Sequence, residues 1–202
     1  VIVYVESNFF LEVALGQEQA SPAEAILTLA ENGKVELTFP GFALSEPFAT
    51  LMQRDRERRR LRSSFTEMLQ QLQRSEPHKQ LVSDLQPVPI ILTNIVEKEF
   101  ELLQSTVVRL LNIGRHIEID ATGFTQALAY QGTLDLSPQD SIIYSAVIGD
   151  MQQRSGEEVK CFLSRDKEAF STNRRIKSEL ASYNCRYIGS FREGLNFIQR
   201  FA

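Results

Sequence analysis

Apolar and polar positions repeat with two different periods along the chain. Short β-rich apolar runs, typical of strands buried in a parallel sheet, predict strands at residues 1–5, 117–119, 159–163 and 186–189, and alternating apolar and polar residues predict a strand at 35–39. Apolar side chains at helical spacing predict helices at residues 9–15, 21–32, 43–51, 124–130, 137–151, 167–180 and 193–201. Ser21, followed by Pro22 and by Glu24, predicts a capping box at the start of the second helix.

The segment from about 52 to 113 has a different pattern, with two long amphipathic stretches separated by prolines. Its first stretch carries Leu61, Phe65, Met68, Leu69 and Leu72, and the second runs from Leu92 to Leu111. We interpret the segment as a helical insertion within a single domain spanning 1–202. The Leu92–Leu111 stripe is then core, or alternatively a surface for a homodimer or another partner. Strands that alternate with helices predict a three-layer α/β/α fold around a mostly parallel sheet of four or five strands.

The amino-acid composition limits the classes of function that are possible for this chain. Apolar residues make up 43% of the chain and charged residues 24%, which permits a sizeable core and excludes wholesale disorder. The net charge of −4 excludes a bulk positive field, so nucleic acid would have to bind at a local basic patch. Two such patches occur, Gln53–Arg62 with six arginines and two acids, and Arg174, Arg175 and Lys177. Either can be ordinary solvated surface; the second follows Asp166 closely and is the one we expect to approach a substrate.

Cysteine use and hydropathy predict a cytoplasmic protein. Cys161 and Cys185 each lie in an apolar run, which predicts reduced, buried thiols without a disulfide framework. No apolar stretch approaches the roughly 18 residues needed to span a bilayer, and the first residues lack the basic flank of a signal peptide. We therefore expect no membrane partner.

Four acids lie where predicted strands end or predicted helices begin. Glu6 follows the first strand, Glu46 lies in the helix after the second, Asp140 lies in the first turn of the 137–151 helix, and Asp166 follows the 159–163 strand. Binding sites of open α/β sheets form beyond the carboxyl ends of the strands, so these carboxylates can converge. Each also has a structural alternative: Asp140 as a helix cap, Glu46 as a favourable charge at a helix start, Glu6 and Asp166 as loop residues.

The stretches that carry these acids resemble the PIN-domain family. They are YVESNFFLEVAL at Tyr4–Leu15, FPGFALSEPF at Phe39–Phe48, LSPQDSIIYSAV at Leu136–Val147 and FLSRDKEAF at Phe162–Phe170. The resemblance implies a PIN-like fold and a metal-dependent ribonuclease that uses Mg²⁺ or Mn²⁺ to cut RNA. Many bacterial members are toxins that pair with an antitoxin protein.

The resemblance also implies roles for individual residues. Glu6, Glu46, Asp140 and Asp166 would be the catalytic and metal-binding acids, supported by Asn8, Ser164 and Asn173, while Arg174 and Arg175 would hold RNA. The family usually has Asp where this chain has Glu6, which is one methylene longer and puts the metal geometry in question.

Two other functions remain open from the sequence. A phosphatase with a strand-end nucleophile generally needs two aspartates spaced DxD, whereas this chain has Glu6-Ser7-Asn8. A non-catalytic PIN-like module that binds RNA or protein is favoured only by the presence of Glu6.

Overall fold

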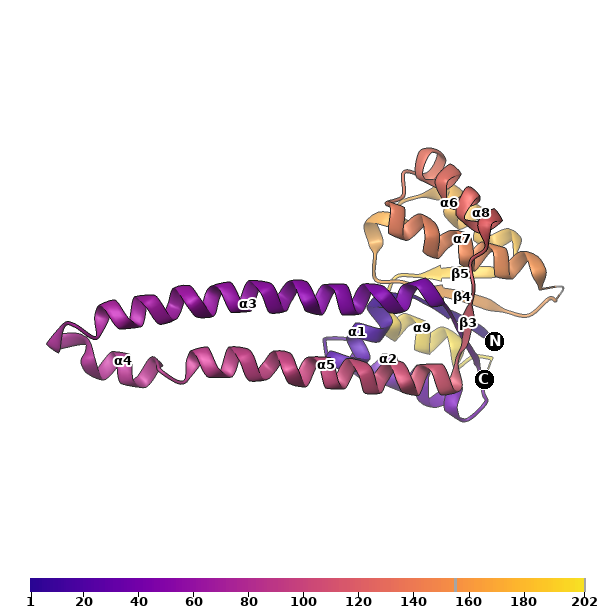
Figure 1. Cartoon of the computed structure of the whole chain (residues 1–202). Coiled ribbons are helices and arrows are strands. Elements are labelled where there is room, and N and C mark those ends of the chain that lie inside the picture. Colours follow the sequence, from indigo (N-terminus) through magenta and orange to yellow (C-terminus); the bar gives the residue numbers. More distant parts are fainter. Residues whose placement is uncertain (155, 202) are drawn as a thin grey trace.

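One parallel sheet organises the fold. In a computed structural model of the chain, which describes residues 1–154 and 156–201, five strands lie in the order β3-β2-β1-β4-β5 (Figure 1). All neighbouring pairs are parallel. The strands are β1 (Ile2–Val5), β2 (Glu36–Pro40), β3 (Arg115–Ile117), β4 (Lys160–Leu163) and β5 (Cys185–Ile188). The predicted mostly parallel sheet of four or five strands is thus confirmed, with strand ends shifted by one or two residues.

Helices cover both faces of the sheet, as expected for parallel strands joined by crossover connections. One layer holds α1 (Ser7–Leu15), α2 (Ala20–Glu31) and α9 (Phe191–Ile198). The layer on the other face holds α6 (Ala121–Leu134), α7 (Pro138–Gln153) and α8 (Arg174–Ser182), as Figure 1 shows. The three-layer α/β/α architecture follows from this arrangement.

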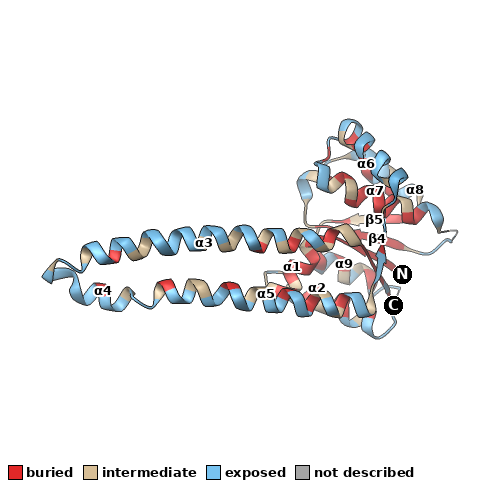
Figure 2. Cartoon of the chain, viewed as in Figure 1, coloured by how far each residue is buried: buried red, intermediate tan, exposed pale blue. Residues whose placement is uncertain are grey.

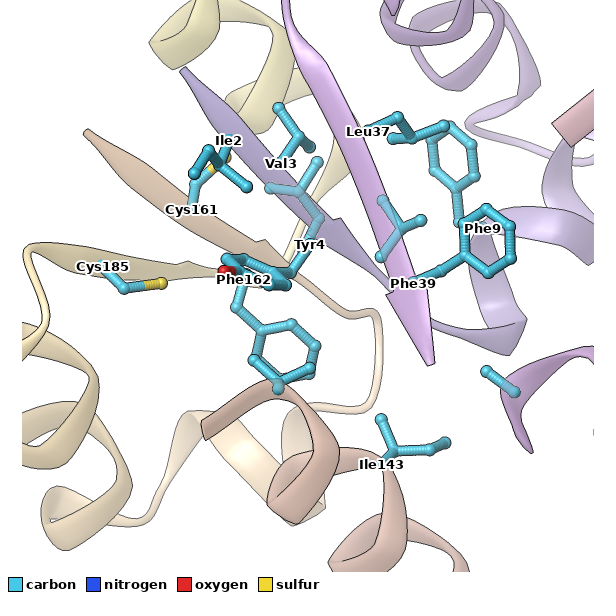
Figure 3. Close-up of a cluster of buried hydrophobic side chains, with 14 of the residues drawn as sticks. Ile2, Val3, Tyr4, Phe9, Leu37, Phe39, Ile143, Cys161, Phe162 and Cys185 are labelled. Carbon is cyan, nitrogen blue, oxygen red and sulfur yellow. The ribbon is translucent and has the colours of Figure 1, made fainter. Parts of the chain in front are cut away.

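The core lies on both sides of β1, whose four residues are all buried. Tyr4 and Phe162 point toward the α7 layer, while Leu37 and Phe39 point toward α1, where Phe39 packs edge-on against Phe10 at 5.5 Å (Figure 3). A strand buried on both faces explains why the sequence shows continuous apolar runs rather than alternation. Both cysteines are free and buried, as predicted.

A helical hairpin projects from the sheet-containing head, and we call it the arm. It consists of α3 (Ser45–Leu72), a 3-10 turn (Glu76–His78), α4 (Lys79–Leu85) and α5 (Val88–Ile113). Helices α3 and α5 run side by side away from the sheet, and most of the arm is exposed (Figure 2). A separate helix at 43–51 was predicted, but a 3-10 turn (Gly41–Leu44) precedes Ser45 and α3 then runs unbroken. Pro47 lies within the first turn, where proline is tolerated, and no glycine or further proline interrupts the helix.

Another local prediction was wrong. The capping box at Ser21 does not form, because α2 begins at Ala20 with Gln19 before it. The Gln19 side chain instead accepts hydrogen bonds from the Phe191 amide (2.7 Å) and the Ser190 hydroxyl (3.0 Å), which ties α2 to the start of α9. The segment 167–180 is mostly helical, as predicted, and consists of a π-helical turn (Lys167–Ser171) followed by α8, whose start is capped by Asn173.

Among the described residues, no helix combines the length and the apolar character needed to cross a bilayer.

Candidate active site

Glu6 is a buried carboxylate at the point where β1 leads into α1. It is the N-cap of α1, and its Oε2 accepts a hydrogen bond from the Asn8 amide at 2.9 Å. The residue is only 3% exposed, and within the described structure no donor reaches its Oε1. Burial raises the pKa of Glu6 from 4.5 to about 7, and the charge of Glu46 adds to the rise. A buried carboxylate with a free oxygen is costly unless a proton or a cation neutralises it.

Ser7 joins Glu6 to Glu46. Its hydroxyl lies 2.9 Å from Oε2 of Glu6 and 2.5 Å from Oε2 of Glu46, which lies in the first turn of α3. A hydroxyl has one proton and can donate to only one carboxylate at a time. The second contact therefore calls for a proton on one carboxyl group or a nearby cation. Sequence reasoning missed Ser7, because a serine after a strand gives no signal of its own until Glu46 is folded against it.

Asp140 lies in the first turn of α7, at the position that the Ser137-Pro138 start predicted. Its amide donates to the Ser137 hydroxyl at 3.1 Å, and that hydroxyl lies 2.5 Å from its Oδ2. Desolvation raises the pKa of Asp140, and the charges of Asp166 and Glu46 raise it further. Asp140 is therefore within electrostatic reach of both acids, in addition to capping its helix.

Asp166 follows β4 and begins the π-helical turn. Its Oδ1 accepts from the Ala169 amide at 2.9 Å, and its own amide donates to the buried Ser164 hydroxyl at 3.0 Å. The Tyr187 hydroxyl donates to the Ser164 carbonyl at 3.0 Å, and burial raises the pKa of Tyr187 to about 12, with smaller contributions from the charges of Asp166 and Glu6. Tyr187 lies on β5 and carried no sequence signal; its hydroxyl lies within hydrogen-bond distance of the carbonyls of both Ser164 and Asp166.

The four acids thus come from four chain segments to the carboxyl edge of the sheet, where the charge of Glu46 raises the pKa of Glu6 and of Asp140, and the charge of Asp166 raises the pKa of Asp140. Within residues 1–154 and 156–201, however, no three carboxylate, histidine or cysteine side chains are close enough together to hold a metal ion as they stand. Mutual repulsion of carboxylates favours such separation, so joint coordination requires side-chain rotation. The donor set, all carboxylate oxygens with one buried and unpartnered, fits Mg²⁺ or Mn²⁺.

Two of the three predicted supporting residues contact acids of the site, and the third does not. Asn8 holds Glu6 through its backbone amide, which donates to the carboxylate, and Ser164 holds Asp166 through its hydroxyl, which accepts from the Asp166 backbone amide. Asn173 instead caps α8 through the Arg175 amide (3.0 Å) and donates to the Leu134 carbonyl (2.9 Å), so its contacts serve helix packing.

The predicted RNA-binding cations also differ in what surrounds them. Arg174 is exposed, whereas Arg175 donates to the Thr133 carbonyl at 3.1 Å. A hollow of about 670 Å³ borders Asp166 and is lined by Arg165 and Lys167, two cations that the sequence had not singled out. Arg165 also pairs with the buried Glu12 and with Glu18, at 2.9 Å for the latter. The basic run 53–62 lies on the arm, where Arg58 pairs with Glu99.

Asp150 belongs to a different cluster. It accepts from the Tyr4 hydroxyl at 2.8 Å and from Arg154 at 2.9 Å, and it also pairs with Arg115. These contacts fix the C-terminal part of α7 to the starts of β2 and β3, at the sheet edge away from the four acids.

Comparisons with protein-family models, with curated proteins and with solved structures gave no match.

Proposed function

We propose that the chain is a divalent-metal-dependent endoribonuclease that hydrolyses RNA phosphodiester bonds. Glu6, Glu46, Asp140 and Asp166 bind the metal, which would be Mg²⁺ or Mn²⁺. The observation that carries the proposal is the buried Glu6 carboxylate, which has one oxygen without a donor and a second bound to Ser7 beside Glu46. Asp140 lies within electrostatic reach of Glu46, and Asp166 lies within electrostatic reach of Asp140.

The chemistry follows from charge. Hydrolysis of a phosphodiester adds negative charge to an already anionic group, and bound divalent cations supply the neutralisation and an activated water. The four carboxylates would hold the cation, and the Ser7 hydroxyl contacts the carboxylates of both Glu6 and Glu46. Arg165 and Lys167 beside Asp166, and exposed Arg174, can each hold a phosphate of the RNA strand.

The test uses two matched substitutions five residues apart. Asp140→Asn removes a carboxylate of the proposed site and keeps the side-chain shape. Asp135→Asn removes an exposed carboxylate at a left-handed position (φ 55°), which asparagine also tolerates. We expect millimolar Mn²⁺ to raise the melting temperature of the wild type and of Asp135→Asn by the same amount, and to have a much smaller effect on Asp140→Asn.

Cleavage of a mixed RNA pool in Mn²⁺ and in Mg²⁺ completes the test. Wild type and Asp135→Asn should cut RNA in metal and lose activity in chelator, while Asp140→Asn should be inactive. A wild-type protein that binds RNA but cuts none with either metal would replace the proposal with the non-catalytic alternative. An unchanged wild-type melting temperature in metal would remove the metal site itself.

A further inference from the structure

Three hollows follow one another along the β5 edge of the sheet, beginning at Asp166. β5 is the last strand on this side, so among the described residues no strand lies beyond it. The hollow of about 670 Å³ beside Asp166 shares Gly189 and Glu193 with a second hollow of about 320 Å³, which in turn shares Arg186 and Phe197 with a third of about 310 Å³. Because neighbouring hollows share lining residues, they form one path that leads away from the candidate site, and we call it the edge path.

The edge path is bounded by β5 and by one face of α9. Arg186 near the start of β5 contacts Phe197 near the end of α9, so α9 runs back along the strand that precedes it. Side chains three and four positions apart share one face of a helix. The face that lines the path, in α9 and the turn after it, carries Glu193, Asn196, Phe197 and Arg200. The path therefore follows β5 from its carboxyl end, at the candidate site, to its amino end at Cys185.

The charge along the edge path becomes more positive with distance from Asp166. The hollow beside Asp166 is lined by two cations and three acids. The second hollow is lined by Arg186, Arg200 and one acid, Glu193, and the third by Arg186 and the buried Lys160 with no acid among its lining residues. A chain with a net charge of −4 thus presents a locally positive strip that begins at the candidate site. Such a strip attracts a polyanion.

Arg186 and Arg200 are both exposed where they line the second hollow. The guanidinium carbon of Arg186 lies 5.7 Å from the centre of the Phe197 ring, a cation–π contact that orients the side chain without using its N–H donors. Within the described part of the chain, neither arginine is among those that pair with an acid, in contrast to Arg58 and Arg109. Both can therefore bind phosphate without first breaking an ion pair.

Two phenylalanine rings lie at the far end of the edge path. The ring centres of Phe197 and Phe201 are 5.2 Å apart, and Phe201 is 52% exposed where it lines the third hollow. An exposed aromatic ring beside cations can stack on an unpaired base, whereas the bases of a duplex are already stacked on their neighbours. The path therefore fits a single strand better than a duplex.

An endonuclease has to position its substrate on both sides of the bond that it cuts. Arg174 and Arg175 begin α8, which covers the opposite face of the sheet from α9 (Figure 1). The edge path starts on the α9 side of Asp166, because Ser190 and Glu193 line its first hollow. A strand that passes over Asp166 can thus contact Arg174 or Arg175 at one end and the edge path at the other.

We propose that the edge path binds single-stranded RNA on one side of the cleavage site. Arg186 and Arg200 hold phosphates there, since these phosphates lie beyond the cation of the metal site, and Phe201 stacks on a base. The identity of the strand as RNA rests on the proposed ribonuclease function, whereas the binding itself requires neither the metal nor cleavage.

The test measures RNA binding by fluorescence anisotropy in chelator, with a labelled oligouridine of about 12 nucleotides, a length typical of single-strand sites. Arg186→Gln combined with Arg200→Gln should weaken binding about tenfold or more at about 0.1 M salt. It should also lower the slope of log affinity against log salt by about 1.4, because each phosphate contact on a single strand contributes about 0.7. Arg56→Gln combined with Arg60→Gln is the matched control: it removes the same charge from two exposed positions on the arm and should change the affinity less than about twofold.

Two further measurements test the single-strand assignment. Phe201→Leu keeps an apolar side chain but removes the ring, and it should weaken binding about fivefold or more. An unlabelled duplex of the same length should compete poorly with the labelled strand. Thermal melts should give each variant a midpoint close to that of wild type, since the substituted side chains are exposed.

The outcomes separate this proposal from the proposed function. Equal binding by wild type and by the variant with both Arg186 and Arg200 replaced would overturn the edge path, even if wild type cuts RNA. A duplex that competes as well as a single strand, or an unchanged affinity of Phe201→Leu, would overturn the stacking of an unpaired base. A wild-type protein that cuts no RNA in Mn²⁺ or Mg²⁺, but whose RNA binding depends on Arg186 and Arg200, would refute the nuclease and support the path.

Discussion

Burial of Glu6 has a measurable consequence for stability, which Glu6→Gln tests directly. The substitution keeps the shape of the side chain and an oxygen that can accept from the Asn8 amide, but it removes the charge. In the metal-free folded protein the Glu6 pKa is about 7, compared with its ordinary value of 4.5. The folded state therefore keeps a proton that the unfolded state loses between these two pH values.

The sign and the magnitude follow from proton linkage. A raised carboxyl pKa favours folding below pH 4.5 relative to higher pH, and this advantage is lost as the pH rises through 7. One pKa unit corresponds to about 1.4 kcal/mol. Relative to a protein with Glu6 fully protonated, the pKa shift lowers the free energy of unfolding by about 3 kcal/mol at pH 8 and by under about 1 kcal/mol at pH 5. Glu6→Gln should therefore raise the free energy of unfolding at pH 8 by up to about 3 kcal/mol, with most of the gain absent at pH 5.

The assay is urea unfolding followed by circular dichroism at pH 5 and at pH 8, with a chelator present so that no cation neutralises Glu6. Asp135→Asn serves as the control for removing an exposed carboxylate, and its effect should be small at both pH values. A Glu6→Gln effect that is the same at both pH values, or a loss of stability at pH 8, would refute the reasoning about burial. Glu6→Gln should be the more stable protein at pH 8 in chelator. Excess Mn²⁺ should make wild type the more stable one, because the cation stabilises wild type more than Glu6→Gln.

Two further predictions concern the RNA-binding cations and the packing of the arm against the sheet. Arg174→Ala combined with Arg175→Ala should weaken RNA binding and make it less dependent on salt, because fewer counterions are released; fluorescence anisotropy measures both. Arg56→Ala combined with Arg60→Ala on the arm should have the smaller effect. A larger effect of the arm variant would contradict our placement of the RNA. Gly114→Ala should destabilise the protein by about 1–3 kcal/mol in urea unfolding, since its Cβ would lie 2.6 Å from the Phe39 ring and 3.1 Å from the Leu110 carbonyl. Gly132→Ala, in α6 with open space around the new Cβ, should instead stabilise the protein by about 0.5–1 kcal/mol. Equal changes in stability at the two glycines would argue against close packing at the end of α5.

Local patterns predicted the main elements because each depends on residues that are near one another in the chain. The apolar run Ile2–Val5 had to be a strand buried on both faces, and Ser137-Pro138 with Asp140 had to begin a helix, since its cap uses only neighbouring groups. The start of α2 could not be read in this way. Gln19 is held by Ser190 and Phe191, residues about 170 positions away, and that contact overrides the local signal at Ser21.

In the candidate site, too, local sequence predicted some features, while contacts between distant segments decided the others. The position of each acid after a strand or at a helix start followed from the sequence, because parallel strands bring their carboxyl ends to one edge. The distances among the acids did not follow, and neither did the roles of Ser7 and Tyr187, since these depend on side chains from separate segments meeting in space. For the same reason Asn173 matched a supporting position by sequence, while its contacts tie it to α6 and α8.

The sequence by itself determined the alternation of strands and helices, the parallel sheet and the chemical type of the candidate site, because periodicity and residue type encode them locally. Only the tertiary structure decided how far Glu6 is buried, since a pKa of about 7 depends on every group that excludes water from it. The structure likewise decided that the 52–113 segment belongs to an arm whose far part projects from the head, while the C-terminal part of α5 packs against α1. Helical periodicity specifies that a face is apolar, but only the three-dimensional arrangement of α3 and α5 shows which part of that face remains uncovered.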